Sequence, residues 1–479
     1  MKNPDSLNTD LTLTSSEMKW LGQEIISLVI EHFDKLHGKA VLNIASVDEL
    51  RDVLLTDMPS EGRELSDVVS QIQTILLGNL SHGDHPKFFA FVPGPSNFVG
   101  AMADALVAGF NVCASNWLEA SSFAEIERIT IEWLARMMGY SNSAGGHFVS
   151  GGSMANLTAI AVAREIKLGN PDPEAIVYYS DQTHISVERG LKVLGFSQEQ
   201  MRRISTDDSF RIDTVDLIEK ITTDRKRDLR PFCLIANVGT TNTGAVDPIE
   251  ELFEICSVND MWLHLDAAYG GAAVLTQNGK SLLGDLSLAD SITIDPHKWL
   301  FQPIECGCLL VKDRSWLRAA FDTSPEYLSD VDEGVGEINY YQEGIQLTRQ
   351  SRALKLWMSL QVFGVDAFSS AVEQGIENAK HVEKKLSELE CWEIISPATL
   401  GIVVFRYNLP GISVEDLGSL NQKIADKLTK SGIAFIGTTL LNELRVLRMC
   451  TINPRTSIKD LDETIEALDN FAKELHVLS

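Results

Sequence analysis

One lysine stands in a setting that changes the chemistry of its amine. Lys298 lies in the stretch SITIDPHKWLF, in which residues 291–294 have the pattern of a short buried strand that an Asp-Pro turn ends. The turn places His297 and Lys298 at the carboxyl end of the strand, where ligands bind in open α/β sheets. Because apolar neighbours disfavour the ammonium form, we predict an amine that is nucleophilic toward aldehydes. A lone lysine after a strand is usually an ordinary surface residue, so the prediction depends on partner groups elsewhere.

A carboxylate ends a second strand pattern. Residues 262–265, WLHL, are apolar and lead into Asp266 and then into AAYGG, which includes Ala268. Leaving a carboxylate unpaired in an apolar setting costs several kcal/mol, and on the order of 2–7 kcal/mol is lost even for a neutral polar group. Asp266 therefore needs a cationic partner. The protonated ring nitrogen of pyridoxal 5′-phosphate (PLP) would be such a partner.

A third stretch suits the phosphate of the same cofactor. Residues 148–156, FVSGGSMAN, run from an apolar segment through paired glycines into a helical pattern. The free backbone N–H groups at Gly152, the hydroxyl of Ser153 and the positive end of the helix dipole all favour an anion there. The sequence thus predicts a phosphate site at this helix start.

Two further strand ends carry polar side chains. YYSDQTH ends with His184 at the start of a predicted helix, where its ring could stack on a flat cofactor. NVGTT ends another strand on the same side as Asp266, and either Thr240 or Thr241 is a candidate cofactor contact. Together these groups predict a PLP site in which Lys298 forms the Schiff base with the cofactor's aldehyde.

Three of these stretches, taken together, resemble a known family. SDQTHISVERG, HLDAAYGG and DPHKWL have the order and spacing seen in the group II PLP-dependent amino-acid decarboxylases, and the likeness runs from about Asp48 to the C-terminus. It implies an α/β protein of PLP fold type I, with a mainly parallel seven-stranded sheet in the large domain. It also implies the cofactor contacts Lys298, Asp266, Ala268, His184, Gly152, Ser153, Thr240, Thr241 and His297.

The resemblance also implies how the chain is divided. We expect a helical arm over residues 1–96, a large PLP-binding domain over 97–353 and a small α/β domain over 354–479. Thr14 and Glu17 fit a capping box that opens a helix, and a second box is predicted at Ser122 and Glu125. From 148 to 312, strand-like and helical runs alternate, which predicts a largely parallel sheet. In the resembled family the arm packs on the partner subunit, so a homodimer with a shared active site is expected.

The overall composition limits the partners. The chain has 479 residues and a formal net charge of −26, which argues against nucleic acids and anionic membranes, since both attract basic patches. Seven cysteines, an odd number, favour reduced thiols, and no long apolar run is present. We therefore expect a cytoplasmic enzyme without a metal. Cys306 and Cys308 are too close for a usual zinc pair and are predicted to lie in the core.

A polar, glycine-containing segment over residues 321–344 is predicted to be functional, because long irregular segments inside compact domains usually are. Its SPEYL stretch resembles the catalytic loop of the decarboxylases, and this resemblance makes Tyr327 catalytic together with Lys298 and His184. Members with phenylalanine at this position tend to be aldehyde synthases, so Tyr327 predicts a true decarboxylase. The alternative is a surface loop whose tyrosine has no role.

The substrate side is the least determined. In the family, the stretch FFAFVPGP lines the substrate pocket, although it could equally link the arm to the large domain. The predicted pocket residues are Phe91, Val92, Pro93, Gly94, Ser115 and Trp117, and the aromatic ones favour an aromatic L-amino acid. Yet Ser115 and Gly94 stand where aromatic members usually have Phe and Thr, and Met154 replaces a common glutamate. A diamino, acidic or aliphatic substrate, an aldehyde synthase and an aminotransferase of the same fold remain alternatives.

Overall fold

The computed structural model describes residues 11–323 and 334–477. They form two compact units, Met1–His85 and Pro86–Ser479. Tyr327 and the rest of the SPEYL stretch lie outside the described residues. No helix within the described ranges combines the length and the apolar composition that a membrane-spanning segment needs. The domain limits expected after residues 96 and 353 stay predictions.

The N-terminal unit is helical. Its helices are α1 (Ser15–Lys35), α2 (Val47–Leu54) and α3 (Leu65–Gln71), with short turns η1 (Leu36–Gly38), η2 (Ile72–Leu76) and η3 (Leu77–Asn79). The capping box is confirmed, because Glu17 N donates to Thr14 Oγ1 at 3.3 Å and Thr14 N donates to Glu17 Oε2 at 2.7 Å. Neither α1 nor α2 contains a buried residue, and α1 exposes the apolar side chains of Ile25, Ile26 and Ile30.

The second unit contains the predicted sheet. Seven strands lie in the order β1-β7-β6-β5-β4-β2-β3, and β7 runs antiparallel to β1 and β6 while all other pairs are parallel. The MRRI sequence of β3 is half polar, so no apolar run predicts this strand. The strands are β1 (Gly145–Val149), β2 (Ala175–Ser180), β3 (Met201–Ile204), β4 (Arg230–Asn237), β5 (Trp262–Asp266), β6 (Ser291–Ile294) and β7 (Gly307–Val311).

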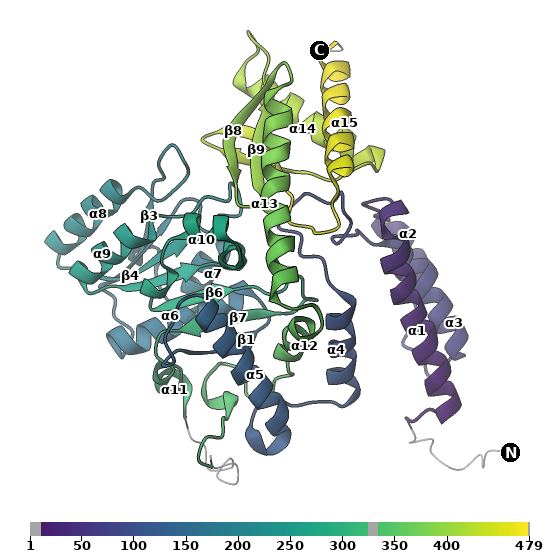
Figure 1. Ribbon diagram of the computed structural model, residues 1–479, viewed down its shortest axis with the longest axis horizontal. Coiled ribbons are helices and arrows are strands. Elements are labelled where there is room, and N and C mark those ends of the chain that lie inside the picture. Colours follow the sequence, from purple (N-terminus) through teal and green to yellow (C-terminus); the bar gives the residue numbers. More distant parts are fainter. Residues whose placement is uncertain (1–10, 324–333, 478–479) are drawn as a thin grey trace. The chain divides into compact units, whose positions relative to one another are not determined.

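Helices cover both faces of this sheet (Figure 1). Successive residues alternate between two core clusters, so that Val177 and Tyr179 join one cluster and Tyr178 joins the other. Both predicted core cysteines, Cys306 and Cys308, are buried free thiols. The covering helices and turns are α4 (Phe98–Gly109), α5 (Trp117–Met137), α6 (Gly152–Leu168), α7 (Ile185–Val193), η4 (Gln198–Gln200), α8 (Thr214–Lys226), α9 (Ile249–Asn259), η5 (Gly270–Leu275), α10 (Gln277–Leu283), η6 (Leu286–Leu288), α11 (Ser315–Phe321), η8 (Tyr340–Gln342) and α12 (Ala353–Phe363).

Helix α5 begins earlier than the sequence predicted. Its N-cap is Asn116, whose Oδ1 accepts a hydrogen bond from Glu119 N at 2.9 Å, and Ala120 then interrupts the helix with non-helical angles. The box predicted at Ser122 is therefore wrong as a helix start. Asparagine caps as well as serine does, and the Glu125 side chain forms an ion pair with Arg128.

A smaller antiparallel sheet follows, with its own core cluster and the strand order β10-β11-β9-β8. Helix α13 contacts both this sheet and η5 of the large sheet's layer, so it joins the two halves of the unit (Figure 1). The elements are α13 (Val365–Ser387), β8 (Trp392–Thr399), β9 (Ile402–Tyr407), α14 (Val414–Ser431), β10 (Gly437–Leu441), β11 (Leu444–Cys450) and α15 (Ile458–Val477).

Candidate active site

A cavity of about 380 Å³ lies where β1, β4, β5 and β6 end. Parallel strands bring their carboxyl ends to one edge of a sheet, so residues far apart in sequence meet there. The cavity is lined by every cofactor contact that the sequence predicted, namely Lys298, Asp266, Ala268, His184, Gly152, Ser153, Thr240, Thr241 and His297.

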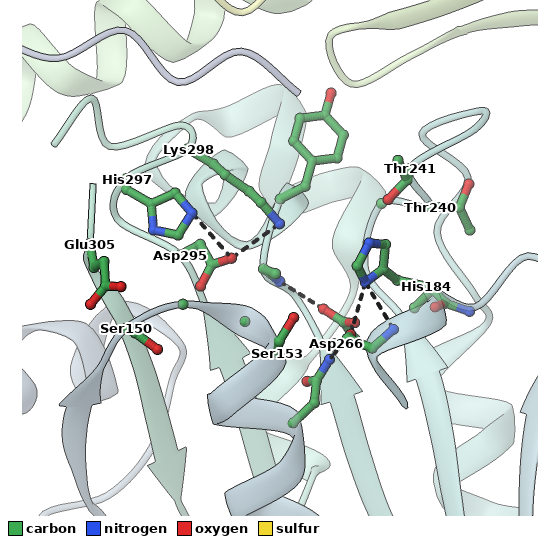
Figure 2. A pocket seen from close by; sticks show the side chains of 18 of the residues that line it. Ser150, Ser153, His184, Thr240, Thr241, Asp266, Asp295, His297, Lys298 and Glu305 are labelled. Carbon is green, nitrogen blue, oxygen red and sulfur yellow. Dashed lines mark hydrogen bonds and ion pairs between the residues drawn. The ribbon is translucent and has the colours of Figure 1, made fainter. Parts of the chain in front are cut away.

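Lys298 faces a buried carboxylate across the Asp-Pro turn. Its Nζ lies 3.1 Å from Asp295 Oδ2, and His297 Nε2 lies 3.7 Å from the same oxygen. Figure 2 shows Asp295 between these two side chains. Asp295 Oδ1 is buried and has no hydrogen-bond partner in the described part of the chain. Asp295 was predicted only to end its strand, although its spacing of three residues from Lys298 could have identified it as a partner of the amine.

Trp299, the residue after the lysine, holds the turn in place by packing in the core. Trp299 is fully buried and stacks on Tyr269, with ring centroids 5.1 Å apart and planes inclined by 14°. The Tyr269 hydroxyl in turn accepts a hydrogen bond from Gly401 N at 2.8 Å. The aromatic pair therefore joins the AAYGG and HKW stretches and ties both to the small sheet, which fixes the turn that carries Lys298.

Asp266 is 8% exposed and accepts hydrogen bonds from neutral donors. Asn156 Nδ2 donates to Asp266 Oδ2 at 2.8 Å, and Ala268 N donates to Oδ1 at 3.2 Å. A carboxylate has about four lone-pair directions, so capacity is left for a cationic donor in the cavity. Asn156 stands in the quoted FVSGGSMAN stretch but was not singled out; its i+4 spacing from Gly152 places both on one face of α6.

The start of α6 suits an anion. No side chain caps this helix, and Gly152 belongs to its first turn, whose N–H groups have no intrahelical acceptors. A Cβ on Gly152 would lie 2.8 Å from Asp295 Oδ2 and 3.2 Å from Ala268 Cβ. A Cβ on Gly307 would come within 2.4 Å of Gly151 Cα. Only glycines allow the helix start to approach the lysine turn this closely.

His184 caps α7 and lies beside Asp266 (Figure 2). Ser186 N donates to its Nδ1 at 3.3 Å, and Ser186 Oγ lies 2.8 Å from the same nitrogen. Burial lowers the pKa of His184, which keeps the imidazole neutral near neutral pH. Burial also lowers the pKa of His297, whose Nδ1 lies 2.8 Å from the carbonyl oxygen of Cys306.

The two threonines differ in their surroundings. Thr240 is buried, and its hydroxyl lies 2.8 Å from that of Thr243. Thr241 is partly exposed at the cavity wall. The Thr240 hydroxyl is thus already engaged within its own loop, which leaves Thr241 as the better placed of the two to contact a ligand.

The predicted substrate-pocket residues are not brought to this cavity. Ser115 is buried and its Oγ accepts a hydrogen bond from Arg349 N at 3.2 Å, while Trp117 packs against the main core. Phe91 lines a separate cavity of about 310 Å³ beside the small sheet. Gly94 lies against the lysine turn, where a Cβ would come within 1.8 Å of the His297 carbonyl oxygen. Val92 and Pro93 do not line the cavity either.

One cluster in the N-terminal unit has metal-ligand types. Ligand atoms of His32, His82 and Asp84 lie within 4.8 Å of one another. His32 Nε2 already lies 2.8 Å from Asp84 Oδ2. We treat the cluster as a histidine–carboxylate pair and assign it no metal.

The cavity residues fit PLP. The first turn of α6 offers free N–H groups to an anion, Asp266 has acceptor capacity left for a ring N–H, and Lys298 offers an amine to an aldehyde. Such an arrangement can bind an amine-containing substrate through the cofactor and stabilise negative charge that develops beside the ring.

Comparisons with known proteins point to the same chemistry. The model of the pyridoxal-dependent decarboxylase conserved domain matches residues 48–408. Aromatic-L-amino-acid decarboxylase of Bacillus atrophaeus is 44% identical, with 98% of each chain covered. Phenylacetaldehyde synthase of Petunia hybrida is 29% identical over 97% of this chain and 96% of its own. The crystal structure of Catharanthus roseus tryptophan decarboxylase in complex with L-tryptophan is 26% identical, with a TM-score of 0.90 over 97% of this chain and 99% of its own. The chain therefore belongs to the pyridoxal-dependent decarboxylase family and is a PLP-dependent carboxy-lyase.

Proposed function

We propose that this enzyme converts an aromatic L-amino acid to the corresponding amine and CO₂. The observation that carries the proposal is the convergence of Lys298, Asp266 and the start of α6 on one cavity. The choice of an aromatic substrate is supported by the 44% identity to an aromatic-L-amino-acid decarboxylase over nearly the whole chain. That relative is a bacterial enzyme whose length this chain covers almost completely.

Each cavity residue is proposed to contact a different part of the cofactor. When bound, PLP supplies an aldehyde for the substrate amine and an electron-poor ring that accepts the electron pair released with CO₂. Lys298 holds the aldehyde end, and the Asp266 carboxylate keeps the proton on the ring nitrogen. Gly152 and Ser153 bind the phosphate, and His184 packs against the ring as a neutral imidazole.

Asp295 orients the lysine amine. Lys298 Nζ lies 3.1 Å from Asp295 Oδ2 and would stay beside this carboxylate whenever it is not bonded to the cofactor. An ionised carboxylate at this distance stabilises a protonated amine and holds it near the site. His297 Nε2 lies 3.7 Å from the same oxygen, which is too far for a hydrogen bond, so Lys298 is the nearer partner of Asp295.

Tyr327 completes the proposal as the proton donor. A phenol on a loop over the site can protonate the carbon from which CO₂ has left and can keep competing O₂ away. The resemblance of SPEYL to the decarboxylase loop supports this role and favours an amine over an aldehyde product.

The enzyme is proposed to act as a cytoplasmic homodimer with a shared active site. The arm supports a dimer, because α1 exposes Ile25, Ile26 and Ile30 and has no buried residue, which leaves an apolar surface for a partner subunit. All seven cysteines are free, which suits a reducing compartment. Sedimentation velocity of the holoenzyme tests the dimer, and a monomer at micromolar concentration would contradict it.

Product analysis tests the activity. The holoenzyme is incubated separately with L-tryptophan, L-tyrosine, L-phenylalanine, L-glutamate, L-2,4-diaminobutyrate and L-leucine, and amine, aldehyde, keto acid and CO₂ are quantified by mass spectrometry. We expect one amine and one CO₂ per aromatic substrate consumed. Aldehyde with peroxide would indicate an aldehyde synthase, keto acid an aminotransferase, and turnover confined to the last three substrates would overturn the aromatic assignment.

A further inference from the structure

A single buried amide contacts Asp266 directly and reaches His184 through Ser186. Asn156 is 1% exposed on α6, and its Nδ2 lies 2.8 Å from Asp266 Oδ2 and 3.1 Å from Ser186 Oγ. Its Oδ1 lies 3.0 Å from His264 Nε2. The amide thereby connects α6 with the end of β5 and with the start of α7.

The hydrogen-bond directions in this network follow from the chemistry of its members. An ionised aspartate only accepts, so Asn156 must present its NH₂ group to Asp266 and its Oδ1 to His264. A carbonyl oxygen only accepts, so His264 Nε2 carries a proton and donates to it. Burial lowers the pKa of His264 to about 4, which makes the ring neutral and leaves its Nδ1 as an acceptor.

The chain of bonds continues to a fixed donor in the core. Ser291 Oγ lies 2.8 Å from His264 Nδ1, and Trp262 Nε1 donates to the same oxygen at 2.9 Å. An indole N–H can only donate, so the Ser291 hydroxyl must turn its proton toward His264. Trp262, Ser291 and His264 are each no more than 1% exposed, and this dry setting strengthens the directional preference of every bond.

The second proton of the amide sets the other branch. Asn156 Nδ2 donates to Ser186 Oγ, so the Ser186 hydroxyl proton is free to turn to His184 Nδ1, 2.8 Å away. The Ser186 backbone N–H also donates to that nitrogen. His184 Nδ1 is therefore an acceptor, and in the neutral ring the proton sits on Nε2.

We propose that Asn156 is a positioning residue that aims the Asp266 carboxylate and fixes the proton of His184 through one amide. The inference rests on the proposed function, in which both side chains contact the PLP ring. In the described part of the chain, Asn156 is the side chain that hydrogen bonds to Asp266 and, through Ser186, reaches His184. The other charged or titratable groups facing this region are His264 on β5, Arg189 on α7, and Asp295 and Lys298 in the turn after β6.

The test is Asn156→Asp, which keeps the shape of the side chain but replaces the donor with an oxygen. Two carboxylates this close take up one shared proton, and the protonated pair again offers an O–H donor to Asp266. The variant should therefore resemble the wild type at low pH and fail at high pH. PLP affinity of the apoenzyme, measured by equilibrium dialysis, should be weaker than wild type by about tenfold at about pH 9 and by less than about threefold at about pH 6.

A matched control makes the same chemical change elsewhere. Asn259, at the end of α9, donates from its Nδ2 to the Ile255 carbonyl at 2.8 Å and is not part of the cavity. Asn259→Asp adds the same charge, and its PLP affinity should equal that of the wild type at both pH values. An Asn156→Asp affinity equal to wild type throughout, or reduced by the same factor at both pH values, would overturn the proposal.

A second variant keeps the test decisive if Asn156→Asp does not fold. In a double-mutant cycle of Asn156→Ala and Asp266→Asn, the loss of PLP affinity in the double variant should be clearly smaller than the sum of the two single losses, because part of the effect of the amide passes through the carboxylate. Fully additive losses would overturn the proposal. Both readouts measure cofactor binding without substrate, so failure of the aromatic assignment leaves their outcome unaffected.

Discussion

The two sides of the cavity are built differently. On the cofactor side, Asp266, Asn156 and His264 are held by successive hydrogen bonds of 2.8–3.0 Å among residues that are at least nine-tenths buried. Elsewhere in the cavity lining, Ile304 is 77% exposed, and Glu305 follows it in the chain. The strand ends of one sheet hold the buried part of the lining, whereas the exposed part comes from the segment between β6 and β7, which belongs to no strand of this sheet. We therefore expect substitutions in the buried part to change the rate of the reaction and substitutions in the exposed part to change the substrate preference.

Removing the lysine should have the largest effect. Lys298→Ala loses the covalent attachment to the cofactor, so turnover should fall on the order of 10³-fold or more, about 4 kcal/mol in activation free energy. PLP should still bind noncovalently through the remaining contacts. Steady-state amine production is the measurement, with Lys312→Ala, at the lysine that follows β7, as the control. Substantial turnover by Lys298→Ala would remove the lysine from the mechanism.

Neutralising the ring partner should be next in size. Asp266→Asn keeps the side-chain volume but loses the charge that holds the pyridine proton, and electrostatic effects of this kind are worth roughly 3–4 kcal/mol, or about a hundredfold or more in kcat. Asp224→Asn is a matched control, since it breaks a buried pair with Arg202, 2.7 Å apart, away from the cavity. The control should lower the melting temperature and leave kcat unchanged. Near-normal kcat for Asp266→Asn would mean that the carboxylate serves only the fold.

The buried histidine behind Asp266 should make the enzyme acid-sensitive. Burial lowers the pKa of His264 to about 4 in the folded state, whereas the unfolded chain binds a proton near the usual value of about 6.5. The unfolded state thus gains protons first, and stability is lost as pH falls from about 6.5 to about 4, by roughly 3 kcal/mol. The free energy of unfolding, measured with urea, should fall as pH falls across this range. The slope of this dependence should be smaller in His264→Gln, by the amount that corresponds to about one bound proton. An unchanged slope would contradict a neutral His264.

The loop tyrosine should change the product more than the rate. Tyr327→Phe removes the proposed proton donor and keeps the ring, so the ratio of aldehyde to amine should rise about tenfold or more, with peroxide release. The visible absorption spectrum and PLP affinity should stay as in the wild type. Products are followed by mass spectrometry together with oxygen uptake. Amine formation at the wild-type rate without oxygen uptake would show that the donor lies elsewhere, with His184 the first residue to test.

Asp295 should have the smallest effect. Asp295→Asn leaves the PLP contacts in place but weakens the electrostatic hold on the released Lys298 amine, so kcat should fall roughly fivefold to tenfold, about 1 kcal/mol. The slowed step should be the return of the lysine to the cofactor, which single-turnover absorption kinetics can isolate. A slower first turnover with normal recovery would place Asp295 in substrate binding instead.

Local motifs predicted which residues meet in the cavity. Strand patterns followed by Asp266 or by Asp-Pro-His-Lys determine both the sheet and the residues at its edge, because parallel strands bring their ends together. Asn156 and Asp295 were missed as site residues. Asn156 looks like an ordinary polar residue of a helix, and Asp295 looks like an ordinary turn residue before a proline. Ser115 accepts a hydrogen bond from Arg349 N, 234 residues away, and Trp117 packs against the core. No local pattern predicts these contacts, and the pocket role of both residues stays a prediction.

The most direct test of the account is to find where the cofactor is attached. The purified holoenzyme is reduced with borohydride, digested and analysed by tandem mass spectrometry, with the apoenzyme treated in parallel. We predict a single pyridoxyl-phosphate modification, on Lys298, together with loss of the visible absorption band and of activity. Modification of a different lysine, or an unmodified Lys298 in an enzyme that still loses its activity, would contradict the assignment of this cavity as the active site.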